Sequence, residues 1–96
     1  MMVLITYDVD TTSEAGKRRL RNVAKACRDY GQRVQNSVFE CLLTEAQFLL
    51  LRSRLNTIID MELDSIRFYF LGNNWKRRVE SSGKITSFDI SGELIV

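Results

Sequence analysis

The 96-residue sequence has no histidine, no proline and only two cysteines. Without histidine, the usual general base, the Ser-His-Asp triad and His-ligated zinc are excluded. Any bound metal is therefore expected to be a hard cation on oxygen ligands, Mg²⁺ or Mn²⁺. Cys27 and Cys41 are too few for a disulfide framework, and both fall on predicted core faces, which indicates reduced, buried thiols.

Long apolar runs are also missing. No segment has the length needed to span a membrane, and no signal-peptide pattern precedes the first predicted strand, so a cytoplasmic protein without a membrane partner is expected. The chain length predicts one domain with a small core, which often gains stability from oligomerisation. The net charge of +2 says little by itself, so the local arrangement of charges matters more.

What the sequence does contain begins with a strand near its N-terminus. Val3 to Tyr7 form a run typical of a buried central strand, and Asp8 follows at its C-terminal end. Burying a carboxylate at that place costs free energy unless it is paired or bound to a cation. Asp8 either caps the turn formed by the polar residues 10–13 or has a metal-binding or catalytic role, and the spacing alone does not decide between the two.

The order of predicted elements indicates a fold. A helix is expected between a Thr11/Glu14 capping box and Gly31, and a second helix after a Thr44/Gln47 capping box. Strands are expected at 33–35, 38–43 and 65–71. The order βαββαβ predicts an α+β, ferredoxin-like fold: an antiparallel sheet with both helices on one face.

The second face of this sheet has no predicted cover within the chain. It carries enough apolar residues to predict a homodimer through the sheet face. If the helices cover the side of Val3, Ile5 and Tyr7, then Asp8 lies on the dimer side. A two-fold axis could then bring two Asp8 carboxylates together, and such a pair shares a proton or recruits a cation.

The first predicted helix carries a basic stripe, which we define as Arg18, Arg21, Lys25 and Arg28. Like charges at these spacings repel one another by a few tenths of a kcal/mol per pair, about 0.2–0.5. The pattern favours an anionic, phosphate-bearing partner over a simple solvated face. A second basic segment follows the turn at Gly72 and is a further candidate for nucleic-acid binding; it consists of Lys76, Arg77 and Arg78 next to Trp75.

Several of these motifs together resemble a known family. The segments Tyr7-Asp8-Val9, Tyr30 to Gln35, Ser37 to Cys41, Asp64 to Arg67 and Leu71-Gly72 occur in the order and spacing of the small ferredoxin-like nucleases of CRISPR adaptation. This is the family conventionally numbered second among the CRISPR-associated proteins. Residues 33–41 look most like members from type I, subtype C systems.

The resemblance implies a metal-dependent endonuclease acting on RNA or DNA. It also implies a homodimer that binds double-stranded DNA and works with the CRISPR adaptation integrase in spacer acquisition. By the same resemblance, Asp8 is the metal-binding residue, Lys17 and Arg19 belong to the nucleic-acid-binding set, and the catalytic set is Asp8, Tyr7, Arg33 and Phe39.

Three alternatives stay open at this point. Arg33 could only bond a nearby carbonyl, while Phe39 and Tyr7 could only pack in the core. The protein could be an architectural DNA-binding adaptor without relevant catalysis, or a related ribonuclease toxin. Residues 1–80 are expected to form the ferredoxin-like domain, and residues 81–96 a tail with an extra strand that pairs with the partner subunit.

Overall fold

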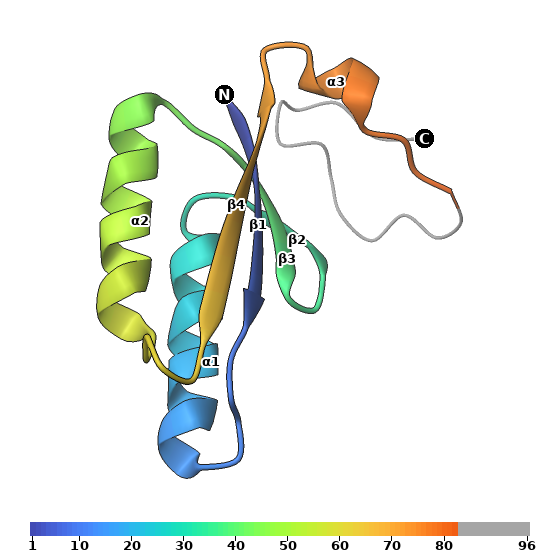
Figure 1. Cartoon of the computed structure of the whole chain (residues 1–96). Helices are drawn as coiled ribbons and strands as arrows, with labels where there is room; N and C mark the ends of the chain where they lie inside the picture. Colours follow the sequence, from blue (N-terminus) through green and yellow to red (C-terminus); the bar gives the residue numbers. More distant parts are fainter. Residues whose placement is uncertain (83–96) are drawn as a thin grey trace.

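The computed structural model describes residues 1–82 (Figure 1). Four strands form one sheet in the order β2-β3-β1-β4, and all neighbouring strands are antiparallel. Helices α1 and α2 lie side by side on the same face of this sheet (Figure 1). The predicted ferredoxin-like fold is confirmed. Its elements are β1 (Met2–Asp8), α1 (Glu14–Arg28), β2 (Gln32–Gln35), β3 (Val38–Leu42), α2 (Glu45–Ile58), β4 (Ser65–Gly72) and α3 (Trp75–Arg78).

The core lies between the sheet and the two helices. Alternate residues of β1, namely Val3, Ile5 and Tyr7, are buried in it. They pack with Val23 and Cys27 of α1 and with apolar residues of α2. Each fully buried aliphatic side chain contributes roughly 1.5–3 kcal/mol, so this shared face holds the helices against the sheet. The helices therefore cover the side of β1 that carries Val3, Ile5 and Tyr7, and Asp8 points away from them.

The first helix begins later than the sequence pattern predicts. Ser13, not Thr11, is its N-cap, and the Ser13 hydroxyl accepts from the Gly16 amide over 3.0 Å. The Thr11/Glu14 capping box is wrong because the chain needs residues 9–12 for the turn out of β1. Gly16 is required there, since any Cβ would collide with the Asp10 carbonyl.

The second helix begins as predicted. The Thr44 hydroxyl accepts from the Gln47 amide over 3.1 Å, and the Gln47 side chain accepts from the Thr44 amide over 2.9 Å. This capping box is confirmed. Phe48, Leu51 and Leu55 form its buried face.

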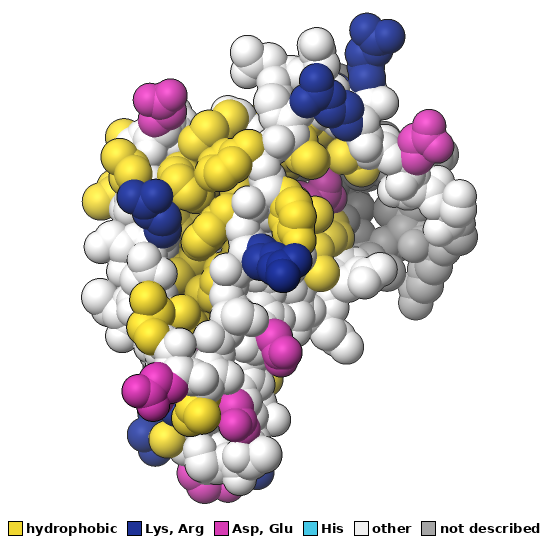
Figure 2. Space-filling view, in the orientation of Figure 1, with side chains coloured by type: hydrophobic (Ala, Val, Ile, Leu, Met, Phe, Trp, Pro, Cys, Tyr) yellow, Lys and Arg dark blue, Asp and Glu magenta, His cyan; other side chains and the backbone are white. Residues whose placement is uncertain are grey.

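An apolar surface lies between α2 and β4 (Figure 2). The Phe48 ring contacts Phe68 and Phe70 at centroid distances of 5.3 and 5.1 Å, in edge-on geometry. Despite this contact with α2, Phe70 keeps 56% of its surface exposed. On the opposite, helix-free face of the sheet, Leu42 and Tyr69 are 40% and 43% exposed.

The basic segment after β4 forms the short helix α3, which the sequence pattern did not predict. Gly72 precedes it with a φ of 77°, a left-handed conformation that favours glycine. The Arg78 guanidinium donates to the Leu71 carbonyl and closes this turn. The predicted extra strand between Ile85 and Val96 lies outside the described residues. Among residues 1–82, no helix is long and apolar enough to cross a membrane.

Candidate active site and a separate arginine pocket

Asp8 ends β1 opposite Ser65 of β4, and it is exposed. Within residues 1–82 its carboxylate forms no ion pair and no hydrogen bond. The turn that follows is capped by other residues: Asp10 accepts from the Thr12 amide over 2.9 Å and from its hydroxyl over 2.7 Å. The alternative in which Asp8 caps this turn is therefore wrong, and the carboxylate is available to a ligand.

Asp8 lines a pocket of about 320 Å³, here called the Asp8 pocket. Arg67 lines it because β4 pairs with β1 so that Arg67 faces Thr6, two residues from Asp8. The Tyr69 hydroxyl accepts from Arg67 over 3.3 Å. The pocket is lined by Thr6, Tyr7, Asp8, Ser65, Arg67 and Tyr69.

Sequence reasoning missed Arg67 as a site residue. The signal was present in β4, where Arg67 and Tyr69 alternate with the apolar Ile66 and Phe68. That alternation puts Arg67 on the helix-free face, the same face as Asp8. The register that sets it near Asp8 is not visible in the sequence.

The predicted catalytic residues do not all lie on the same face of the sheet. Tyr7 points to the helix side, and β3 brings Phe39 to the same side, opposite Ile5. Arg33 pairs with Phe39 and stands over its ring at 5.3 Å. Within one chain, Arg33 and Asp8 therefore lie on opposite faces of the sheet.

Phe39 has no exposed surface, and its ring stacks on Tyr7 at a centroid distance of 6.2 Å. Phe39 thus packs in the core of the chain, and its ring does not reach the surface. Tyr7 is buried too, with 6% of its surface exposed, and its hydroxyl donates to the Asn36 carbonyl over 3.3 Å. Burial raises the pKa of Tyr7, and the positive charges of Arg33 and Arg28 oppose that rise.

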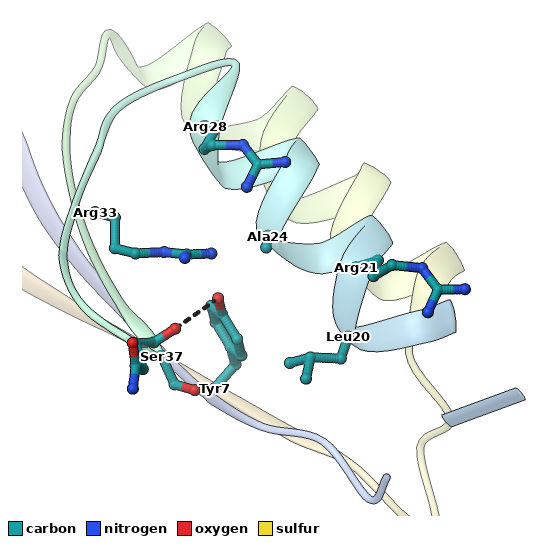
Figure 3. A pocket seen from close by; sticks show the side chains of 8 residues that line it. Tyr7, Leu20, Arg21, Ala24, Arg28, Arg33 and Ser37 are labelled. Atoms are coloured by element: carbon teal, nitrogen blue, oxygen red, sulfur yellow. Dashed lines mark hydrogen bonds between the residues drawn. The ribbon is translucent and has the colours of Figure 1, made fainter. Parts of the chain in front are cut away.

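A second pocket, of about 590 Å³, lies on the helix side between α1 and the β2–β3 hairpin (Figure 3). We call it the arginine pocket, because Arg21 and Arg28 come from α1 while Arg33 extends across from the hairpin above the Tyr7 ring (Figure 3). It is lined by Tyr7, Leu20, Arg21, Ala24, Arg28, Arg33, Asn36 and Ser37. Two exposed members of the basic stripe, Arg21 and Arg28, thus also line a pocket.

Arg19 does not join the basic stripe. Its Nε donates to the Asp64 carboxylate over 2.8 Å, and only 18% of the Arg19 side chain is exposed. The prediction that Arg19 contacts nucleic acid is not supported, because the side chain turns toward a buried carboxylate. The sequence pattern did not predict that Asp64 is buried and paired with Arg19.

The other basic residues stay at the surface. Lys17 pairs with Glu14 over 3.3 Å, and the Lys76 ammonium stands over the Trp75 ring at 5.6 Å. Arg77 is exposed. All four members of the basic stripe are exposed as well, and none forms an ion pair within the described residues.

The Asp8 pocket offers the oxygen ligands that Mg²⁺ prefers: one carboxylate and the hydroxyls of Thr6 and Ser65. Among the described residues, no cluster of three or more His, Cys, Asp or Glu side chains is placed to hold a metal. One carboxylate fits Mg²⁺, which usually keeps several waters and binds through one or two carboxylates and substrate phosphates. The donor set therefore fits a weakly held Mg²⁺ or Mn²⁺.

The family model of CRISPR associated protein Cas2 matches residues 1–79. The chain belongs to the Cas2 family. A CRISPR-associated endoribonuclease Cas2 of Chlorobaculum tepidum is 56% identical over 96 residues, which is the whole of both chains. A CRISPR-associated endonuclease Cas2 of Halalkalibacterium halodurans is 56% identical over 95 residues, 99% of each chain.

The fold of the family agrees with this membership. The crystal structure of Streptococcus pyogenes Cas2 at pH 6.5 has a TM-score of 0.77 to this chain and is 65% identical. The match covers 86% of this chain and all of that one. The chain is therefore a CRISPR protein of the Cas2 family with a ferredoxin-like fold, as the sequence motifs predicted.

Proposed function

We propose that the protein is a metal-dependent endonuclease that hydrolyses phosphodiester bonds of RNA or DNA at Asp8. The observation that carries the proposal is the exposed Asp8 carboxylate, which has no partner within residues 1–82 and shares a pocket with Arg67. The printed names of the two relatives, an endoribonuclease and an endonuclease, support a nuclease.

The proposed roles follow from the chemistry of the pocket. A Mg²⁺ held by Asp8 would supply Lewis acidity toward a phosphate oxygen and toward a bound water. Arg67 presents a permanently charged fork of donors, which suits the non-bridging oxygens of a phosphate. The Tyr69 hydroxyl accepts from Arg67 and restrains it, so the guanidinium is held in place before the substrate arrives.

A second copy of the chain completes the proposed site. The helix-free face carries exposed Leu42 and Tyr69, and a two-fold axis through this face would bring two Asp8 carboxylates toward one ion. In the same proposal the dimer binds double-stranded DNA and works with the CRISPR adaptation integrase in spacer acquisition.

The test compares Asp8→Asn with Asp10→Asn, a matched control two residues away. Asn at position 10 can still accept from Thr12, so the turn is preserved. A positioned catalytic group contributes about 100-fold or more to the rate, so Asp8→Asn should lose Mg²⁺-dependent cleavage while Asp10→Asn keeps it. Labelled single strands and duplexes of RNA and DNA, with and without Mg²⁺, give the readout. Cleavage that persists in Asp8→Asn would sink the proposal.

A second candidate is an architectural DNA-binding subunit without relevant catalysis. The exposed basic stripe favours it, since duplex binding by that stripe does not need Asp8. Absence of cleavage on all four substrates, together with retained duplex affinity, would select this function.

A further inference from the structure

We propose that the arginine pocket binds the 5′-phosphomonoester of a nucleotide unit, as a site separate from the Asp8 pocket. The arginine pocket is lined by residues of α1 on the helix side, whereas the Asp8 pocket is lined by Thr6, Asp8 and Arg67 on the helix-free face, and Tyr7 lines both. The proposal goes beyond the nuclease function and does not depend on it.

Charge is the first argument. The pocket lining contains three arginines and no acidic residue. None of Arg21, Arg28 and Arg33 forms an ion pair with a carboxylate of residues 1–82. The planar guanidinium is the side chain best suited to phosphate oxygens. A dianion would neutralise charges that the described part of the chain leaves uncompensated.

The placement of the arginines is the second argument. Arg21 and Arg28 are seven positions apart in α1, which corresponds to roughly 10 Å along the helix axis. The small Ala24 lies between them on the same side of the helix. Ala24 leaves the space into which Arg33 extends from the hairpin (Figure 3). All three arginines line this pocket and come from two elements, and in Figure 3 the Arg33 guanidinium extends into it while that of Arg21 points away from Arg33. A monoester offers three terminal oxygens to them, whereas an internal diester offers two.

Size and lining indicate the rest of the ligand. A volume of about 590 Å³ falls within the range of small-molecule sites, about 300–1,000 Å³, and exceeds what a bare phosphate needs. Leu20 and Ala24 supply apolar surface, while Asn36 and Ser37 supply polar groups at the hairpin end. This combination fits a flat nucleoside attached to the phosphate.

The primary test is calorimetric titration of the full-length protein with AMP, adenosine and inorganic phosphate in EDTA at constant ionic strength. We expect AMP to bind at least ten times more tightly than adenosine. Arg33→Gln and Arg28→Gln, both at exposed positions, should each weaken AMP binding about tenfold. The matched control is Arg18→Gln, which removes the same charge from α1 outside the pocket and should change the affinity by less than twofold. Asp8→Asn should behave like this control.

Two further arms distinguish the sources of the phosphate. Short oligonucleotides with a 5′-phosphate or a 5′-hydroxyl are titrated in the same way. Tighter binding of the phosphorylated strand, lost in Arg33→Gln, identifies the end of a nucleic acid as the ligand. Binding of AMP alone identifies a free nucleotide.

The proposal is overturned by either of two results. In the first, AMP and phosphorylated strands bind no more tightly than adenosine and hydroxyl-ended strands. In the second, Arg18→Gln weakens AMP binding as much as Arg33→Gln, which would mean general electrostatic attraction. An Asp8→Asn variant that fails to affect cleavage refutes the nuclease proposal and leaves this one unchanged.

Discussion

Arg19 and Asp64 lie 45 positions apart in the sequence, and the Arg19 Nε donates to the Asp64 carboxylate over 2.8 Å. The Asp64 side chain has no exposed surface, and it also accepts from the amides of Asp10 and Asp60 over 3.0 and 2.9 Å. Asp64 therefore joins α1, the turn after β1 and the start of β4. These are the segments that frame Asp8.

Replacing Asp64 should destabilise the protein strongly. Asp64→Asn keeps the size but leaves Arg19 without its charge partner, and the new amide group meets two backbone donors. Breaking a buried pair by removing one partner costs about 3–5 kcal/mol, a large share of a small domain's stability. The measurement is urea unfolding. Asp29→Asn is the matched control, since it breaks the exposed Asp29–Arg54 pair and should cost no more than about 1 kcal/mol. A similar small loss for both variants would contradict the structural role of Asp64.

The buried Asp64 carboxylate should make the free energy of unfolding depend on pH. Burial raises the pKa of Asp64, but hydrogen bonds from Arg19, Asp60 and Asp10 outweigh this and hold it below the usual value. Because the pKa is lower in the folded state, the ionised carboxylate stabilises the protein at pH values above the unfolded pKa of about 3.9. This stabilisation is lost as the pH falls through the folded-state pKa. The difference in unfolding free energy between wild type and Asp64→Asn should therefore shrink below about pH 4. Urea titrations from neutral to acid pH measure it, and a constant difference would contradict it.

The basic stripe should set the salt dependence of duplex binding. Each phosphate neutralised contributes about −0.9 to the slope of log affinity against log salt. The double variant Arg18→Gln/Lys25→Gln should flatten that slope by about 1.8 per chain if both side chains make contact. Arg52→Gln/Arg54→Gln on α2 removes the same charge elsewhere and should leave the slope nearly unchanged. Equal slopes for the two double variants would show that the stripe is a solvated face.

The helix-free sheet face should mediate dimerisation. Light scattering at micromolar concentration should return the dimer mass for wild type and for Leu49→Lys, whose exposed site lies on α2. Tyr69→Lys puts a charge on the helix-free face and should return the monomer mass. A wild-type monomer across this range would remove the basis for a shared Asp8 site.

The two cysteines should be inert in the folded protein. Burial raises the pKa of both Cys27 and Cys41 to about 12, so almost no thiolate is present at neutral pH. A thiol reagent at pH 8 should modify two thiols per chain in denaturant and react far more slowly without it. Rapid reaction of the native protein would contradict their burial.

Local patterns in the sequence determined the elements and their order. The apolar run of β1 and the Thr44/Gln47 capping box act over a few residues, so they can be read without knowing the fold. The strand period also predicts that Tyr7 and Asp8 point to opposite faces. The order of the elements predicted the ferredoxin-like topology, and the family motifs then indicated Asp8 as the candidate metal residue.

Only the tertiary structure decided which of these residues meet. The pairing of Arg33 with Phe39, and of Thr6 with Arg67, depends on strand register between segments far apart in the chain. Those registers move Arg33 away from Asp8 and bring Arg67 toward it. Asp64 and Arg19 look like two more surface charges in the sequence. Their burial arises where a helix and two loops converge, and no local pattern encodes that convergence.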